Sequence, residues 1–100
     1  MICAQFIFRP GVYDEDFRRL DAEIEAYARS LPGFVRIEDW RSPDGTITNA
    51  VYYFTDPDSL ADLARYPQHL EAKSQVERWY EGYRIVVSEV TTTYGDGRLD

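Results

Sequence analysis

The sequence predicts an α+β domain with the element order β-α-β-β-α-β. Apolar and other residues alternate near both ends and in the middle of the chain, as in half-buried strands. Between these stretches, apolar residues recur at three- and four-residue spacing, as on one side of a helix. Pairs that join Pro to Gly or Asp mark the junctions. The length of 100 residues is typical of one domain.

The first strand is expected from Ile2 to Phe8, ended by Pro10-Gly11. Alternation places its side chains on two faces, with one set formed by Ile2, Ala4, Phe6 and Phe8 and the other by Cys3, Gln5 and Ile7. An amphipathic helix follows from about Asp14, a suitable N-cap, to Ser30, before Pro32-Gly33. Its apolar side comprises Phe17, Leu20, Ile24, Tyr27, Ala28 and Leu31.

A hairpin is expected next, with strands at 34–41 and 46–54 around the turn sequence Ser42-Pro43-Asp44-Gly45. In the first of these strands, alternation predicts a common face for Phe34, Arg36, Glu38 and Trp40. In the second, Tyr52 and Tyr53 should face opposite sides, one toward the helices and the other away from them.

The second helical region is expected to begin at Asp56-Pro57, to be interrupted at Pro67 and to end at Gly82. The last strand is expected from Tyr83 to Tyr94, with Ile85 and Val87 on the face opposite Val86 and Val90. The domain would therefore span residues 1–94, and residues 95–100 would form a loose tail.

Two β-α-β-like halves around an antiparallel hairpin indicate a ferredoxin-like sandwich with a four-stranded antiparallel sheet. Two helices can cover only one face of such a sheet, although the first and last strands carry apolar residues on both faces. Because monomers rarely leave large apolar patches in water, the sequence predicts a homodimer formed through the open sheet face.

Composition argues against several classes of function. The net charge is −7 and the chain has no basic block, so nucleic acid is an unsuitable partner. No stretch approaches the roughly 18 apolar residues of a membrane span. The N-terminus lacks the basic region of a signal peptide, and we expect a cytoplasmic location. One Cys and one His argue against a zinc site, and the chain has no Gly-rich phosphate loop, so no metal or cofactor is expected.

Six segments together resemble the antibiotic biosynthesis monooxygenase (ABM) superfamily over about residues 2–94. They are Arg9-Pro10-Gly11, Leu31-Pro32-Gly33-Phe34, Glu38-Asp39-Trp40, Tyr53-Phe54-Thr55-Asp56-Pro57-Asp58-Ser59-Leu60, Tyr66-Pro67-Gln68-His69-Leu70-Glu71-Ala72-Lys73 and Trp79-Tyr80. The resemblance implies a dimeric α+β barrel. The superfamily includes cofactor-free oxygenases of polyketide aromatics, haem-degrading proteins, isomerases and cyclases, so the fold alone does not assign a reaction.

His69 is the only imidazole and the residue expected to be catalytic. The resemblance places it where haem-degrading members carry their axial ligand, and an imidazole there could also transfer a proton or hold a substrate oxygen. The alternative is a His near a helix start that bonds locally. The haem reading also calls for an Asn on the first strand, where only Gln5 could substitute.

Phe54 stands where many catalytic members of the superfamily carry Trp. Their oxygenases also have an Asn four residues earlier, which here corresponds to Ala50, whereas Asn49 is one residue out of register. A one-residue slip turns a strand side chain to the opposite face. Either a bulge returns Asn49 to the pocket, or the oxygenase pair is absent.

The remaining candidates for substrate binding are aromatic or charged. Tyr52, together with Trp79 or Tyr80, would line a pocket between sheet and helices with Phe54 and His69. Trp40 and Arg36 would form either a pocket wall or an interface stripe with an ion pair. Cys3 is expected to be buried and inert.

These residues support a cofactor-independent enzyme, a monooxygenase or a related isomerase or cyclase, acting on a small hydrophobic molecule of aromatic or polyketide type. Two alternatives stay open: a haem-binding or haem-degrading protein with His69 as axial ligand, and a non-catalytic domain that binds a small molecule.

Overall fold

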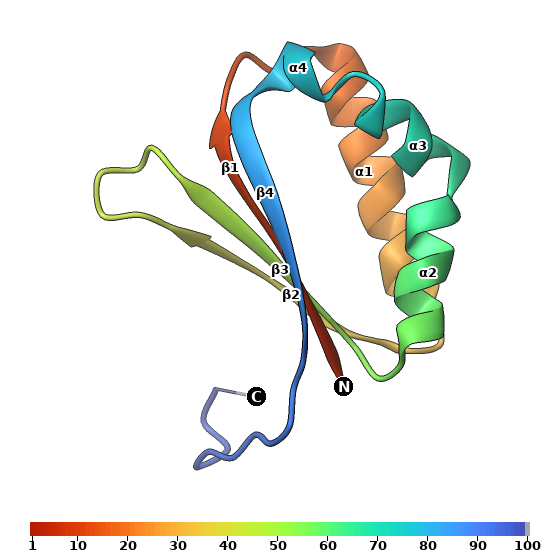
Figure 1. Ribbon diagram of the computed structural model, residues 1–100, viewed down its shortest axis with the longest axis vertical. Coiled ribbons are helices and arrows are strands. Elements are labelled where there is room, and N and C mark those ends of the chain that lie inside the picture. The colour runs from red at the N-terminus through yellow and green to blue at the C-terminus, as the bar shows by residue number, and fades with distance from the viewer. Residues whose placement is uncertain (100) are drawn as a thin grey trace.

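The computed structural model describes residues 1–99 and has two layers, a sheet and a group of helices that cover one face of it (Figure 1). The elements in chain order are β1 (Ile2–Pro10), α1 (Glu15–Ser30), β2 (Phe34–Arg41), β3 (Thr48–Phe54), α2 (Pro57–Arg65), α3 (Pro67–Lys73), α4 (Val76–Trp79) and β4 (Tyr80–Glu89). The four strands lie in the order β2-β3-β1-β4 and all neighbours are antiparallel. This arrangement confirms the predicted α+β, ferredoxin-like class.

α1, α2 and α3 begin where the sequence predicted. The backbone N–H of Phe17 donates to the Asp14 carboxylate at 2.9 Å. The backbone N–H of Ser59 donates to the Asp56 carboxylate at the same distance. Pro57 and Pro67 occupy the starts of α2 and α3, where the missing N–H of proline costs no helical hydrogen bond. Pro67 therefore divides the second helical region, as expected.

The last strand corrects the sequence prediction. α4 ends at Trp79, β4 begins at Tyr80, and the strand ends at Glu89, so Gly82 does not end a helix and β4 does not reach Tyr94. Gly82 lies within β4 opposite Arg9, next to a shift of register between Arg9 and Pro10. Its φ of 154° is accessible to glycine because it has no Cβ. No helix or strand follows in residues 90–99, and the rest of the predicted tail, Asp100, lies outside the described residues.

A β-bulge in β2 corrects a second prediction. Phe34 is paired with Phe54, but the next paired residue is Arg36, with Tyr53, so Val35 is the extra residue. Phe34 therefore shares the helix side with Phe54, whereas Arg36 and the residues alternating with it share the open face. The sequence placed Phe34 with Arg36 because simple alternation cannot reveal an inserted residue.

The hydrophobic core lies between the sheet and the helices. Its buried cluster consists of Ala28, Leu31, Phe54 and Leu63. A second group at the other end of the helix layer includes Leu20 and Trp79, each 1% exposed. Cys3 is also buried, as predicted, although it lies on the open face opposite Tyr53. None of the helices in residues 1–99 is long and apolar enough to cross a membrane.

Asp14 joins the first helix to α4, and its replacement should show this. Besides capping α1, its carboxylate accepts from the Trp79 indole at 3.0 Å and pairs with Arg78 at 2.6 Å. We expect Asp14→Ala to lower the melting temperature more than Asp14→Asn, because asparagine still accepts hydrogen bonds at the cap.

The effect of Asp14 should depend on pH. The Phe17 N–H, with smaller contributions from Arg78 and Trp79, holds the pKa of Asp14 below its usual 3.8. Its charged form therefore stabilises the fold above pH 3.8, and this contribution is lost as the pH falls through the lowered value. Thermal melts at pH 7 and pH 3 check this, and a constant gap between wild type and Asp14→Asn would contradict it.

Candidate functional site

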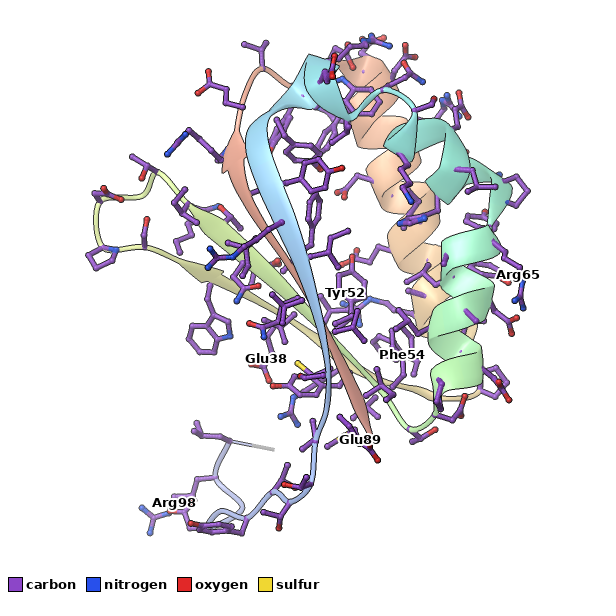
Figure 2. All side chains as sticks on the ribbon, viewed as in Figure 1. Glu38, Tyr52, Phe54, Arg65, Glu89 and Arg98 are labelled. Carbon is purple, nitrogen blue, oxygen red and sulfur yellow. The ribbon has the colours of Figure 1, made fainter. Side chains whose placement is uncertain are left out.

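The two faces of the sheet separate the predicted site residues. The β1–β3 pairing runs without a shift from Ile2 opposite Phe54 to Phe8 opposite Thr48. Strict alternation then directs Tyr52 and Phe54 toward the helices and Asn49 away from them. Figure 2 shows Tyr52 and Phe54 pointing to the helix side, with Glu38 on the opposite side of the sheet. One pocket therefore cannot contain all the residues singled out in the sequence.

Asn49 lies on the open face. Its side-chain amide donates to Gln5 Oε1 at 2.8 Å, while its own Oδ1 is buried and has no hydrogen-bond partner in the described part of the chain. Because β3 contains no bulge between Thr48 and Phe54, nothing returns Asn49 to the face of Phe54. Of the two alternatives for the oxygenase pair, the register thus favours its absence.

Trp40 and Arg36 also lie on the open face, where they form a chain of polar contacts. Arg36 Nε donates to Glu38 at 2.6 Å, and the Trp40 indole donates to the other oxygen of the same carboxylate at 3.0 Å. The Arg36 guanidinium stands 4.7 Å from the centre of the Tyr53 ring. Arg36 and Trp40 therefore belong to an ion-paired group on the open face and do not lie on the helix side with Tyr52 and Phe54.

Phe54 and Trp79 are closed off from any ligand in this conformation. Phe54 is 0% exposed and Trp79 is 1% exposed. Phe54 packs edge-on against Phe34, with 6.2 Å between ring centres, and Trp79 packs edge-on against Phe17 at 5.4 Å. Both side chains are therefore part of the packed core.

Tyr80 stands at the centre of an aromatic cluster on the helix side, formed by Phe6, Phe8, Tyr13, Phe17, Trp79 and Tyr80. Its ring lies 4.8 Å from that of Phe8 and 5.1 Å from that of Phe6, in edge-to-face geometry. Tyr80 is the first residue of β4, so Trp79 and Tyr80 are not neighbours on one helix as expected. Of the two, Tyr80 keeps partial exposure.

The carboxylate of Asp21, on α1, affects two phenols on the helix side of the sheet. Burial raises the pKa of Tyr52 to about 12, and the nearby Asp21 carboxylate adds to that rise. Burial likewise raises the pKa of Tyr80, with Tyr13 and Asp21 contributing. Both phenols therefore keep their protons at neutral pH and can donate hydrogen bonds. Partial burial, together with Glu25 and Asp39, raises the pKa of Asp21 itself.

Asp21 was not among the residues selected from the sequence, although a signal was present. It lies four residues after Phe17 and directly after Leu20, within the apolar side of the helix. A charged residue at such a position lies near other protein groups, although Asp21 is itself exposed to solvent. Its closeness to the phenols of β3 and β4 depends on strand pairing, which the helix pattern does not contain.

His69 lies on α3, half-buried in the helix layer. Its Nδ1 atom is buried and has no hydrogen-bond partner among residues 1–99. The groups that affect its charge are the Ala64 backbone and the Lys73 ammonium, both on the helix layer itself. A buried imidazole nitrogen without a partner is unusual, since buried polar atoms are normally satisfied. Because this atom is buried, a bound molecule would reach it only after neighbouring side chains move.

His69 is expected to titrate below its ordinary pKa of 6.5. Burial disfavours the imidazolium and outweighs the Ala64 backbone, and Lys73 lowers the pKa further. The neutral imidazole thus stabilises the fold fully above pH 6.5, and this contribution is lost as the pH falls through the lowered value. An NMR titration of the single imidazole measures it directly, and a midpoint at or above 6.5 would contradict the burial.

The edge strand β4 is only partly covered on the helix side. Tyr83, Ile85 and Val87 share that side with Phe8, Phe6 and Ala4, their partners on β1. They are nevertheless 49%, 58% and 55% exposed. The helix layer therefore leaves an apolar margin open beside the aromatic cluster, and a flat apolar molecule could contact it.

Two shallow hollows lie at the beginning of β4. One, of about 270 Å³, is bordered by Val76, Glu77, Tyr80, Glu81, Gly82 and Tyr83. The other, of about 300 Å³, is bordered by Ile7, Phe8, Arg9, Ile47, Gly82, Tyr83 and Arg84. Tyr80 thus reaches one of them, whereas His69 and Tyr52 border neither. Within residues 1–99, no group of three or more His, Cys, Asp or Glu residues could hold a metal ion.

Comparison with known proteins gives its result at the level of structure. No protein-family model and no curated protein matches the sequence. SnoaB from Streptomyces nogalater, described as a cofactor-independent oxygenase, superposes with a TM-score of 0.71 and 18% identity, covering 92% of this chain and 94% of SnoaB. The chain has the fold of the antibiotic biosynthesis monooxygenases. The predicted resemblance is confirmed at that level.

Two further structures agree. A candidate antibiotic biosynthesis monooxygenase from Deinococcus radiodurans has a TM-score of 0.73 and 11% identity, with 95% of this chain and 97% of that one covered. Rv0793 from Mycobacterium tuberculosis has a TM-score of 0.69 and 16% identity, with 94% and 98% covered. At such identities the similarity establishes the fold and leaves the reaction to the residues of the site.

Proposed function

We propose that this chain is a cofactor-independent enzyme of the ABM type, a monooxygenase or a related isomerase or cyclase. Its substrate would be a small hydrophobic molecule of aromatic or polyketide type, held between the sheet and the helices. The fold shared with SnoaB supports the class of protein. The observation that carries the proposal is the buried, unpartnered Nδ1 of His69, because a catalytic base needs a free lone pair.

The helix-side residues fit such a substrate. Phe6 and Phe8 supply ring faces, and Ile85 and Val87 supply the open apolar margin. The raised pKa of Tyr52, about 12, keeps its phenol as a donor that could hold a carbonyl or enolate oxygen of the substrate. This combination of apolar walls and a few polar groups is typical of small-molecule sites.

In the proposed reaction, neutral His69 accepts a proton from an acidic C–H or O–H of the substrate. The resulting enolate is the electron donor for O₂. One oxygen atom of O₂ becomes bonded to the substrate carbon that loses its C–H bonds, and the other oxygen atom leaves as water. With no O₂ step, return of the proton to another carbon gives isomerisation. Asp21 is the alternative base, since partial burial and the nearby Glu25 and Asp39 raise its pKa above the ordinary 3.8.

The test is oxygen consumption by the purified protein with an anthrone and a naphthoquinol as substrates. We expect His69→Ala to lower kcat by about 100-fold or more, the usual contribution of a general base. Gln68→Ala, the preceding residue on α3, is the matched control and should keep the wild-type rate. Loss of activity in Asp21→Asn with full activity in His69→Ala would assign the base to Asp21. No turnover by the wild type would remove the proposal.

A haemin titration tests the main alternative, in which the protein binds haem through His69. If His69 were an axial ligand, a saturable Soret band would form with wild type and be lost in His69→Ala. We expect no band that depends on His69.

We further propose that the protein acts as a homodimer through the open sheet face. No helix in residues 1–99 covers that face (Figure 1), and the Arg36–Glu38 pair and Val86, which is 40% exposed, lie on it. Light scattering should give twice the chain mass of 11.7 kDa. Val86→Glu should shift the protein toward monomer, whereas Val12→Glu, at a position 82% exposed before α1, should not. A monomeric wild type would contradict the proposal.

A further inference from the structure

Asp21 is an acidic side chain beside aromatic ones on the helix side of the sheet. It lies on α1 one turn after Phe17, so the two side chains share a side of the helix. The Phe17 ring is 6.0 Å from the ring of Tyr80, in edge-to-face geometry. The Asp21 carboxylate also acts on the phenols of Tyr52 and Tyr80, so it stands near both. Tyr52 points to the same side of the sheet (Figure 2).

A second carboxylate approaches the same place from the sheet. Asp39 of β2 is opposite Ala50, and after the bulge this position projects to the helix side. Asp39, together with Glu25, raises the pKa of Asp21, so like charges lie close together here. Within residues 1–99, neither Asp39 nor Arg41, two residues along the same strand, forms a salt bridge. Asp21 and Asp39 are both exposed, so a molecule can approach them from solvent.

The polar groups around Asp21 lack partners in the described part of the chain. Asp21 forms no salt bridge there, and Arg29, the cation that acts on Tyr52, is already paired with Glu25 at 3.5 Å. The phenols of Tyr52 and Tyr80 have no hydrogen-bond partner, and their oxygen atoms are not fully buried. One carboxylate and two phenol oxygens can thus accept from one group of a ligand. A protonated amine fits, because it is positively charged and has three N–H donors.

We propose that Asp21 determines the specificity of the helix-side site and selects aromatic molecules that carry a protonated amine over those that carry a carboxylate. The ammonium would donate to Asp21 and to the oxygen of Tyr52 or Tyr80, and the ring would lie against the aromatic cluster. A carboxylate in the same place would face a like charge, which disfavours its binding. This inference rests on the helix-side site of the proposed function, but it concerns binding and needs no turnover.

The test is an NMR titration of the ¹⁵N-labelled protein at pH 7 with three ligands that share one ring system. They are 1-naphthalenemethylamine, which is protonated, the uncharged 1-naphthalenemethanol, and the anion 1-naphthoate. We expect the amine to bind most tightly and naphthoate most weakly, with the largest shifts at the amides of Asp21, Tyr52 and Tyr80. Asp21→Asn should weaken binding of the amine by about 5- to 10-fold, because it removes a charge-assisted contact, and should change binding of the alcohol by less than about twofold. Asp39→Asn should weaken binding of the amine by a smaller factor.

Asp58→Asn is the matched control, because it removes the same charge from an exposed position on α2. It should bind the amine like the wild type, which would show that the net charge of −7 is not the cause of the preference. Equal weakening in Asp58→Asn and Asp21→Asn would overturn the proposal. So would naphthoate binding as tightly as the amine, or an amine that does not bind.

Binding and turnover separate this inference from the proposed function. If the protein consumes oxygen with a naphthoquinol but binds the three naphthalene ligands alike, the role of Asp21 in specificity is wrong and the proposed function stands. If binding of the amine depends on Asp21 but neither the anthrone nor the naphthoquinol is turned over, the proposed function is wrong and the role of Asp21 is supported.

Discussion

Replacing Phe54 by alanine is expected to lower the free energy of unfolding by about 3–5 kcal/mol. Phe54 is 0% exposed and belongs to the buried cluster with Ala28, Leu31 and Leu63. Alanine would remove the ring that these residues pack on and leave a cavity that the sheet and helices cannot close. Since a domain of this size has only about 5–15 kcal/mol of stability, the variant would be near the limit of folding.

Urea denaturation monitored by circular dichroism measures this loss. Tyr94→Ala is a suitable control, because Tyr94 is 94% exposed and should change stability by no more than about 0.5 kcal/mol. Phe54→Leu, which keeps most of the volume, should fall between wild type and Phe54→Ala. A loss below about 1 kcal/mol in Phe54→Ala would mean that this end of the core is not packed as described.

Gly33→Ala is expected to cost about 1–3 kcal/mol by overpacking, the second-largest effect. A Cβ at Gly33 would lie 2.6 Å from Asp56 Oδ2 and 2.9 Å from Thr55 Oγ1, and closer still to Ser59 Oγ. These atoms cannot move apart freely, because Asp56 caps α2 and the hydroxyl of Ser59 accepts from the Gly33 N–H at 3.0 Å. The new methyl would thus push β2 away from the start of α2.

The control for Gly33→Ala is Gly95→Ala, where a Cβ would meet nothing within 4 Å and φ needs no glycine. Chemical denaturation of both variants should show a loss only for Gly33→Ala. The Ser59→Ala background adds a sharper check, because it removes the atom nearest to the new methyl. Equal losses from Gly33→Ala with and without Ser59→Ala would show that the clash with Ser59 is not the cause.

Local signals in the sequence were sufficient for the starts of α1, α2 and α3, but not for the end of the helical region at Trp79. Asp14 and Asp56 cap α1 and α2, and Pro67 divides the second helical region, as the sequence predicted. Such signals act within one turn of the chain, so a single sequence contains all the information that they need. The fold class follows from the order of these elements.

The arrangement of the candidate site was harder to predict from the sequence than the fold. The selection of aromatic and polar residues grouped Tyr52, Tyr80 and His69 with Asn49, Trp40 and Arg36, although the last three lie on the other face of the sheet. It also missed Asp21, whose effect on the Tyr52 and Tyr80 phenols arises between a helix and two strands. Side chains that are distant in the sequence meet only after the strands have paired.

By itself, the sequence determined the type and order of the elements, the helix caps and the alternation within β1 and β3, because these depend on neighbouring residues. Only the tertiary structure decided the bulge at Val35 and the early start of β4 at Tyr80. Each depends on which residues face one another across two strands. A shift of one residue there reverses the side to which a side chain points, at little local cost.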